Sequence, residues 1–227
     1  MPKLQKFGKY LLLNKISHRG MGEVYKAKSS GVQGFEKLFA IKRILPKLAQ
    51  SKPFIDMLGD EAKISVSLSH SNIAQIYEFD RIDETYYLAM EFIHGKDLRS
   101  ILESASAIPI EIACYVIAEL AKGLHYLHMA SDDSGKKLNI VHRDISPRNI
   151  IVSFDGEVKI IDFGIANASN RAFKIGNDIF VGKYSCMSPE QLLGKELTCQ
   201  SDIFSAGIVF YELLFKKLPL GLNNTMG

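Results

Sequence analysis

Two short turns in the second half of the chain carry oxygen-bearing side chains at close spacing. The stretch "HRDISPRN" (142–149) contains Asp144 and Asn149, and "KIIDFG" (159–164) is predicted to place Asp162 at the end of an apolar strand. Carboxylate and amide oxygens are ligands for a hard cation such as Mg²⁺, which takes a few of them together with phosphate oxygens. Any one of the three is as readily explained by an Asx turn or a helix cap, but all three in this order are not. Together they indicate a site for a magnesium-bound phosphate.

A lysine and a glutamate in the first half of the chain are the next charged groups that could act there. Lys42 lies in "AIK", and Glu61 is predicted on the following helix, on the same face as Leu58, Ile64 and Leu68. A carboxylate in an apolar stripe is costly unless it is paired, and Lys42 is a candidate partner. Taken alone, each residue has a plainer interpretation, as a lysine at a strand edge and a glutamate in solvent.

The stretch "ISHRGMGEVYK" (16–26) has the composition of half a phosphate-binding loop. A turn that lets backbone amides approach phosphates needs residues without side chains. Gly20 and Gly22 meet that need, whereas Ser17 and Arg19 stand where such loops often carry glycine. We expect the stretch still to cover a nucleotide.

The elements that must position these residues differ between the two halves of the chain. The first half reads as strands with one helix, and the second as long helical patterns. Strands are expected over 9–17, 22–29, 37–45, 73–79 and 85–93, and one helix is expected to begin after Ser51 with Pro53 in its first turn. Later helices are expected over 109–130 and 203–215, and a polar surface loop over 131–139.

The fold class that follows is α+β with two lobes. A β-rich N-lobe over 1–92 would hold a five-stranded sheet and one helix, and a mainly helical C-lobe over 93–227 would follow a link near 92–96. The 203–215 segment contains Glu212 and is too short to span a bilayer, so it is predicted to be a buried helix.

Composition excludes several classes of function. The hydrophobic fraction of 47% and charged fraction of 23% are those of an ordinary globular protein, and a net charge of +3 is too small to argue for nucleic acid or an anionic membrane. Three widely spaced cysteines offer neither a disulfide framework nor a metal knuckle. With no apolar leader at the start, a reducing, cytoplasmic setting is expected.

The ordered set of motifs resembles the protein kinase family. The match runs from about Phe7 to the end of the chain through "ISHRGMGEV", "AIK", Glu61, "HRD…N", "DFG", "SPE" and "SDIFSAG". The stretches "FAIKRILPKLA", "LSHSNIAQIYEF" and "IVHRDISPRN" are similar to those of bacterial Ser/Thr kinases. The separations of 19 positions from Lys42 to Glu61, 5 from Asp144 to Asn149 and 18 from Asp144 to Asp162 fit the family pattern.

The resemblance implies ATP and Mg²⁺ as cofactors and assigns a role to each motif. Lys42 would hold the α- and β-phosphates and pair with Glu61, Asp144 would accept the proton of the substrate hydroxyl, and Asn149 and Asp162 would hold Mg²⁺. The nucleotide would also be contacted by Ile16, Ser17, His18, Arg19, Gly20, Met21, Gly22, Glu23, Val24, Ala40, Met90 as the gatekeeper, the Glu91 carbonyl, the Ile93 amide and Ile151.

The same resemblance implies supporting roles for residues outside the site. His142 and Phe163 would be packing residues, and Asp202 would anchor the loop 142–149 from the start of the buried helix. The histidines of "GLHYLH", His125 and His128, are most simply structural.

Several positions depart from the family pattern and bear on the acceptor and on control. Ser146 replaces a phosphate-binding lysine, Arg148 stands where it could serve the γ-phosphate, and Lys183 replaces a threonine that usually contacts the catalytic aspartate. The hydroxyls of segment 165–187 are those of Ser169, Tyr184 and Ser185, while Arg143 precedes Asp144 as in kinases controlled by loop phosphorylation.

Family members have further helices beyond position 227, so the C-lobe is expected to be incomplete here and Glu190 to lack its usual arginine partner.

The function predicted is that of an ATP-dependent protein kinase that transfers the γ-phosphate to Ser/Thr hydroxyls of protein substrates. The alternative is a pseudokinase that binds nucleotide or other proteins, favoured by the substituted glycine loop. A small-molecule phosphotransferase of the same fold is disfavoured, because such enzymes lack "SPE" and "SDIFSAG".

Overall fold

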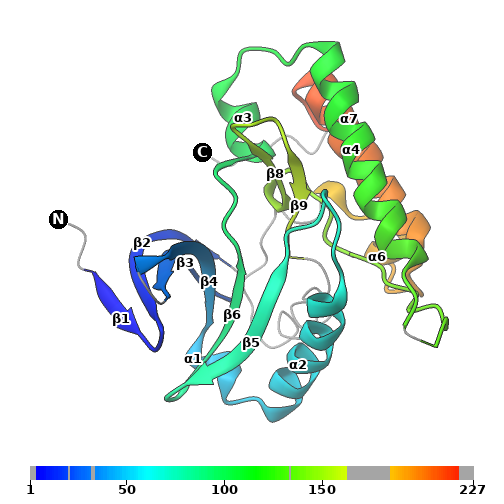
Figure 1. Cartoon of the computed structure of the whole chain (residues 1–227). Helices are drawn as coiled ribbons and strands as arrows, with labels where there is room; N and C mark the ends of the chain where they lie inside the picture. The colour runs from blue at the N-terminus through cyan, green and yellow to red at the C-terminus, as the bar shows by residue number, and fades with distance from the viewer. Residues whose placement is uncertain (1–3, 20, 32–33, 133, 163–184, 220–227) are drawn as a thin grey trace. The chain divides into compact units, whose positions relative to one another are not determined.

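The structure is a computed structural model that describes residues 4–19, 21–31, 34–132, 134–162 and 185–219. Its described residues form two compact units (Figure 1). The first unit contains the described residues up to Ser69 together with Ala74–Ile93, and the second contains His70–Ile73 and the described residues from His94 onward.

The first unit is built on one antiparallel sheet of order β1-β2-β3-β4-β6-β5. Its strands are β1 (Gln5–Phe7), β2 (Tyr10–Arg19), β3 (Gly22–Ser30), β4 (Glu36–Ile44), β5 (Ile76–Ile82) and β6 (Thr85–Glu91). The sheet has six strands where five were expected. The additional strand is β1, which pairs with β2 through three residues and is too short to give a periodic signal.

One face of this sheet carries an apolar core. Its buried members are Phe7, Tyr10, Leu12, Ala27, Ile41, Tyr87 and Ala89. Glu78 lies beside them and accepts hydrogen bonds from Lys9, Tyr10 and Tyr87 at 2.6–2.7 Å. The aromatic rings of this core meet edge to face, with centroid distances of 5.2–5.9 Å.

Two helices complete the first unit, α1 (Pro46–Ala49) and α2 (Lys52–Ser67). Ser51 is the N-cap residue of α2 and Pro53 lies in the first turn, as predicted, although the Ser51 side chain makes no capping hydrogen bond. The buried stripe of α2 consists of Phe54, Leu58, Ala62 and Ser65. The prediction that Ile64 shares the face of Leu58 is wrong: Ile64 is 39% exposed, because the inward positions recur at 54, 58, 62 and 65.

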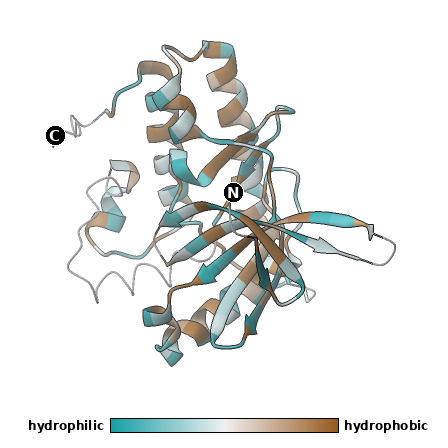
Figure 2. Cartoon of the chain, turned by 90° about the vertical axis from the view of Figure 1, so that its left-hand side faces the viewer, coloured by the Kyte–Doolittle hydropathy of each residue, from teal (hydrophilic) through white to brown (hydrophobic). Residues whose placement is uncertain are grey.

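The second unit packs helices against a small sheet. Its strands β7 (Gly95–Asp97), β8 (Ile150–Ser153) and β9 (Val158–Ile160) pair antiparallel in that order. Its helices are α3 (Leu98–Ser104), α4 (Ile110–Met129), the 3₁₀ turn η2 (Pro147–Asn149), α6 (Pro189–Leu192) and α7 (Cys199–Phe215). Helices α4 and α7 lie side by side (Figure 1) and carry broad hydrophobic stretches (Figure 2). One cluster that includes Leu120, Leu124, Ile160 and Val209 forms the core.

Helix α7 carries a buried ion pair as well as apolar side chains. Glu212 is 5% exposed and accepts two hydrogen bonds from the Arg99 guanidinium, at 2.6 and 3.0 Å. The bidentate geometry compensates the cost of burying the carboxylate. The prediction that this segment is a buried helix is confirmed, with Ile203 and Phe215 at its ends exposed.

The segment His70–Ile73 is joined to the rest of the second unit partly through the buried side-chain amide of Asn72. Asn72 is 3% exposed; its Nδ2 donates to Glu119 at 2.8 Å and to the Val158 carbonyl at 3.0 Å. Its own carbonyl accepts from the Ile160 N–H at 2.8 Å. Asn72 therefore joins this segment to both α4 and β9.

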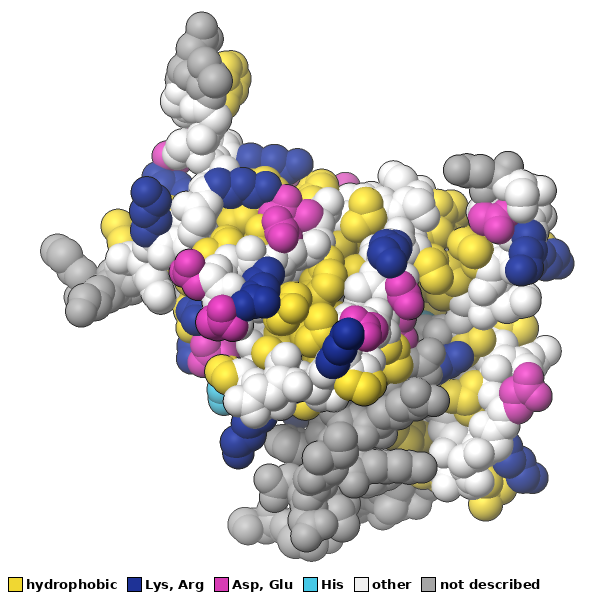
Figure 3. Space-filling view, turned by 90° about the horizontal axis from the view of Figure 1, so that it is seen from below, with side chains coloured by type: hydrophobic (Ala, Val, Ile, Leu, Met, Phe, Trp, Pro, Cys, Tyr) yellow, Lys and Arg dark blue, Asp and Glu magenta, His cyan; other side chains and the backbone are white. Residues whose placement is uncertain are grey.

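The surface agrees with the modest net charge of +3. Lysine and arginine side chains are mixed with aspartate and glutamate on the face drawn in Figure 3. Among the described residues, no helix combines the length and the hydropathy needed to cross a bilayer.

Candidate active site

The loop 142–149 of the second unit is held by one buried carboxylate. Asp202, in the first turn of α7, is 1% exposed. It accepts hydrogen bonds from the backbone N–H groups of His142 and Arg143 and from His128 Nε2, each at 2.8 Å. The prediction that Asp202 anchors this loop is confirmed, and so is the structural role of His128.

His142 fixes the same loop through its ring. The side chain is fully buried; its Nε2 lies 3.1 Å from the Ile161 carbonyl, and its Nδ1 accepts the Asp144 N–H at 3.2 Å. A carbonyl can only accept and an N–H can only donate, so the ring is protonated on Nε2. The predicted packing role of His142 is confirmed, and the ring also orients the backbone of Asp144.

Asn149 and Asp162 lie next to each other at the ends of adjacent strands. The Asn149 carbonyl accepts the Ile161 N–H at 2.9 Å, one residue before Asp162. Asn149 Nδ2 donates to the Asp144 carbonyl at 2.7 Å, so Oδ1 of the same amide points away from that carbonyl. Oδ1 is the atom of an asparagine that can bind a metal ion. Asp162 has a positive φ of 59°, a conformation that is costly for a residue with a side chain. That Asn149 and Asp162 bind a cation together stays a prediction.

Helix α6 is tied to the loop 142–149 by a residue that the sequence reasoning missed. Ser188 and Gln191 form a capping box, and Gln191 Nε2 donates to the Arg143 carbonyl at 2.8 Å. The pattern S-x-x-Q in "SPEQ" signals such a box, but it does not reveal the long-range partner. In the same region Glu190 accepts a hydrogen bond from Ser201 Oγ at 2.5 Å, which lowers the pKa of its carboxyl.

Lys42 and Glu61 both belong to the first unit. Lys42 lies on β4 between β3 and β6, paired with Val24 and Leu88, and is 5% exposed. A lysine so deeply buried is not the solvated strand-edge residue of the plainer interpretation. Glu61 lies on α2, and both of its carboxylate oxygens are buried. The pairing of these two residues stays a prediction.

Three of the residues expected to contact the nucleotide, Val24, Ala40 and Met90, share one face of the first unit's sheet. Val24 is opposite Lys42, and Ala40 is opposite Met90. Directly opposed residues of antiparallel strands point to the same face, and so do residues two apart along a strand. Val24, Ala40, Lys42 and Met90 therefore line the face opposite to the one that holds Ile41. Glu91 follows Met90, and its carboxylate accepts the Gln75 N–H at 3.1 Å.

The predicted nucleotide loop is the tip of the β2–β3 hairpin. Arg19 is paired with Gly22, so the strands close within two intervening residues. Met21 is 5% exposed, and its carbonyl accepts the Leu45 N–H at 2.9 Å. A Cβ on Gly22 would lie 2.2 Å from the Arg43 carbonyl oxygen. Gly22 is thus required by packing against β4, whatever its role toward phosphate.

Ionic contacts close to the tip involve Glu23. Its carboxylate accepts hydrogen bonds from Lys15 Nζ at 2.6 Å and the Tyr25 hydroxyl at 2.9 Å, and His18 Nδ1 lies 3.3 Å away. The hydrogen bond from Lys15, which has the larger effect, and the one from Tyr25 hold the pKa of the Glu23 carboxyl below its ordinary value. Ile16 is 50% exposed, and a β-bulge lies between Lys15 and Ser17.

The remaining predicted residues are distributed over both units. Arg148 is exposed on η2, and Ile151 lies on β8 opposite Lys159. Ile93 is the last residue of the segment Ala74–Ile93, which belongs to the first unit. Gly20, the Arg19 side chain, Phe163, Gly164, Ser169, Lys183 and Tyr184 lie outside the described residues.

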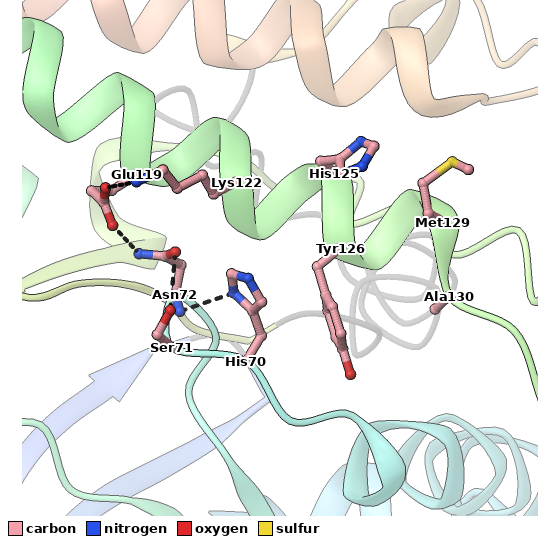
Figure 4. Close-up of a pocket in the computed structure, with 9 residues that line it drawn as sticks. All are labelled: His70, Ser71, Asn72, Glu119, Lys122, His125, Tyr126, Met129 and Ala130. Carbon is pink, nitrogen blue, oxygen red and sulfur yellow. Dashed lines mark hydrogen bonds and ion pairs between the residues drawn. The ribbon is translucent and has the colours of Figure 1, made fainter.

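A separate groove in the second unit has a volume of about 460 Å³ and is lined from segment 70–72 and the second half of α4. Figure 4 shows Asn72 linked to Glu119, which in turn pairs with Lys122 at 2.5 Å. The His70 ring stacks on Tyr126 with centroids 4.8 Å apart. None of the predicted site residues lines this groove.

Comparison with known proteins identifies the family. The protein kinase domain family matches residues 10–227. The tyrosine-protein kinase MasK of Myxococcus xanthus (strain DK1622) is 39% identical over 230 residues, which cover 100% of this chain and 36% of MasK. The serine/threonine-protein kinase PrkC of Bacillus subtilis (strain 168) is 32% identical over 212 residues, which cover 93% of this chain and 31% of PrkC. The chain spans about a third of the length of these relatives.

Solved structures agree on the fold. A crystal structure of the Mycobacterium tuberculosis PknI kinase domain matches with a TM-score of 0.71 at 21% identity, over 98% of this chain and 81% of that one. Its C20A_R136N double mutant gives a TM-score of 0.72 at 20% identity, over 95% and 79% of the two chains. The predicted α+β kinase fold with a β-rich N-lobe is confirmed, and the chain belongs to the protein kinase family, with bacterial serine/threonine kinases among its relatives.

Proposed function

We propose that this chain is the phosphoryl-transferring part of an ATP-dependent protein kinase. The single observation that carries the proposal is the way in which the loop 142–149 holds the backbone of Asp144. The Asp144 N–H donates to His142 Nδ1, and the Asp144 carbonyl accepts a hydrogen bond from Asn149 Nδ2. Phosphoryl transfer asks a protein mainly to position reactants and to stabilise charge, so a rigidly held carboxylate is the feature it requires.

In the proposed reaction a protein hydroxyl attacks the γ-phosphorus of ATP. The new O–P bond forms as the bond from phosphorus to the bridging oxygen of ADP breaks, and Asp144 accepts the hydroxyl proton. Lys42 would bind the α- and β-phosphates, with Glu61 holding the lysine in place. Arg148 would offer its guanidinium to the γ-phosphate from η2.

The residues fit one or more Mg²⁺ ions bound with the nucleotide. The oxygen of Asn149 and the carboxylate of Asp162 would hold the metal; this is supported by their hard oxygen donors and by the backbone hydrogen bond between Asn149 and Ile161, the residue before Asp162. When bound, Mg²⁺ neutralises charge on the phosphates. The adenine would lie against Val24, Ala40 and Met90 from the first unit's sheet, with the Glu91 carbonyl and the Ile93 amide at its edge and Ile151 of the second unit as a further contact.

For the acceptor we propose serine and threonine hydroxyls, as in the names of relatives such as PrkC. Tyrosine is a second candidate because MasK, at 39% identity, is named a tyrosine-protein kinase. Ser146 and Arg148 also depart from the usual Ser/Thr pattern at the positions two and four after Asp144. Phosphoamino-acid analysis of the products separates the two: predominant phosphotyrosine would overturn the first assignment.

We further propose that the protein acts in a reducing cytoplasmic compartment on protein substrates. This is supported by three cysteines that form no disulfide, of which Cys186 is buried and has its thiol pKa raised to about 11 by burial.

The alternative function is that of a pseudokinase, which transfers no phosphate. It requires the ordered loop 142–149 to serve binding alone.

The experiment that tests the proposal measures autophosphorylation with Mg²⁺-ATP in the wild type, Asp144→Ala and Asp162→Ala. Asp144→Ala should lower the transfer rate by about 10²–10⁴-fold, because a general base contributes about that much, while nucleotide affinity stays within a few-fold. Asp162→Ala should lose activity and also Mg²⁺-dependent nucleotide affinity. Wild-type turnover by Asp144→Ala would show that the assignment of the base is wrong.

A further inference from the structure

Gln191 on α6 has a long-range contact that the proposed mechanism does not use. Its side-chain amide makes two hydrogen bonds of different kinds. Oε1 accepts the Ser188 N–H at 2.9 Å, which closes the capping box, and Nε2 donates to the Arg143 carbonyl at 2.8 Å. The first bond is local to the helix, whereas the second spans 48 residues.

The accepting carbonyl belongs to the peptide unit that joins Arg143 to Asp144. The N–H of that same unit donates to His142 Nδ1 at 3.2 Å. Because a peptide is planar and its C=O and N–H point in opposite directions, bonds at both ends fix the rotation of the plane. The plane in turn sets the direction in which the Asp144 side chain leaves the backbone.

The backbone at this point needs such support. Arg143 has a φ of 68°, in the left-handed region that is costly for a residue with a side chain. Its N–H is held by Asp202 at 2.8 Å and its carbonyl by Gln191 at the same distance. A strained residue persists only where its surroundings over-determine it, and Gln191 supplies one of these two restraints.

We propose that Gln191 is a positioning residue for Asp144, and that it orients the carboxylate by clamping the carbonyl of the Arg143–Asp144 peptide. The inference rests on the proposed function of Asp144 as the proton acceptor. Gln191 itself touches neither the hydroxyl nor the phosphate.

The structure offers variants that separate the clamp from the helix cap. Gln191→Glu keeps an oxygen for the Ser188 N–H but has no hydrogen to donate to Arg143. Gln191→Met removes both bonds without adding a charge. The matched control is Ser188→Ala, which removes the hydroxyl that accepts the Gln191 N–H at 3.4 Å and leaves the Gln191 side chain unchanged.

The kinetic test measures kcat per nucleotide-binding site and KM for ATP, so that a lower folded fraction is not counted as slower chemistry. Gln191→Glu and Gln191→Met should each lower kcat about tenfold, which corresponds to about 1.4 kcal/mol, with KM within about twofold. Ser188→Ala should keep kcat within about twofold even where its melting temperature falls. Equal losses of kcat in Ser188→Ala and Gln191→Glu, or wild-type kcat in Gln191→Met, would overturn the proposal.

A second measurement needs no catalytic activity and therefore separates this proposal from the function on which it rests. Hydrogen exchange of the backbone amides over 142–146 should be faster in both Gln191 variants than in the wild type and Ser188→Ala. The same exchange rate in all four proteins would overturn the clamp. A wild type that transfers no phosphate would instead overturn the proposed function.

Discussion

The loop 142–149 and the β2–β3 hairpin are both expected to contact the reacting nucleotide complex, yet they are held in different ways. The loop is fixed by buried polar groups, with Asp202 at 1% and His142 at 0% exposed. The hairpin is fixed by strand register and by ion pairs such as Lys15–Glu23, whose side chains are 43% and 26% exposed. Buried hydrogen bonds are expensive to lose, whereas exposed ion pairs contribute little.

This difference separates two tasks of a phosphotransferase site. A proton acceptor and metal ligands must keep their geometry through the reaction, so a rigid network suits them. A segment that covers the nucleotide must let it enter and leave, and a hairpin held by its register and a few exposed pairs suits that task. Substitutions should therefore have large effects in the loop network and small ones at the hairpin.

The largest effect is expected from Asp202→Ala. The substitution leaves the N–H groups of His142 and Arg143 and the ring of His128 without their shared buried acceptor. We expect a loss of about 3–5 kcal/mol in the free energy of unfolding, the range for breaking a buried charged network. Chemical denaturation measures it, and Asp56→Ala, at an exposed carboxylate on α2, is the control. A loss no larger than that of the control would mean that Asp202 does not hold the loop.

A smaller effect is expected where the hairpin meets β4. Gly22→Ala would place a Cβ 2.2 Å from the Arg43 carbonyl oxygen, so the strands must separate. We expect the free energy of unfolding to fall by about 1–3 kcal/mol, as for overpacking. Gly31→Ala is the matched control, because its Cβ would lie 3.7 Å from the nearest atom. If Gly22→Ala changes KM for ATP but not the melting temperature, the glycine serves the nucleotide and not the sheet.

A still smaller effect, and one that depends on pH, is expected from Glu23→Gln. Lys15 and Tyr25 hold the pKa of Glu23 below its ordinary value in the folded state. A carboxyl with a lowered folded pKa stabilises the protein above its unfolded pKa of about 4.3, and that stabilisation is lost as the pH falls through the folded value. The melting temperature of Glu23→Gln should thus lie slightly below that of the wild type at pH 7, and the two should converge below about pH 4. A difference that grows on acidification would contradict this sign.

The sequence predicts the chemistry of this site better than the contacts that support it. Charged motifs at fixed separations predict roles for Lys42, Glu61 and Asp144, because each proposed role demands one residue type at one place in the chain. Strands β1, β7 and β8 were not predicted, because strands of three or four residues give no measurable periodicity, whereas the apolar run before Asp162 predicted the strand that is β9. The Gln191 clamp could not be foreseen either, since its acceptor is a backbone carbonyl 48 residues away and carries no sequence signal.

The smallest effect is expected at the hairpin tip, from Arg19→Gly. Arg19 is the last residue of β2, and its backbone is paired with Gly22, so the substitution changes the tip without removing a strand. A guanidinium near the phosphates would attract them, but its bulk would also keep backbone amides at a distance. With Lys42 and Mg²⁺ already neutralising phosphate charge in the proposed complex, hindrance should outweigh attraction. Arg19→Gly should then lower KM for ATP by a few-fold, about 1 kcal/mol or less.

Lys42→Met is the reference variant for that measurement, because removal of the buried lysine that is proposed to bind phosphate should nearly abolish activity. Steady-state kinetics at varied ATP concentration compares both variants with the wild type. If Arg19→Gly raises KM about tenfold, Arg19 is a phosphate ligand, and the hairpin contributes about as much binding energy as a charge-assisted hydrogen bond. In that case the contrast between a rigid loop and an adaptable hairpin would not hold at the tip of the hairpin. A phosphate ligand needs a fixed geometry, which only the loop network was expected to provide.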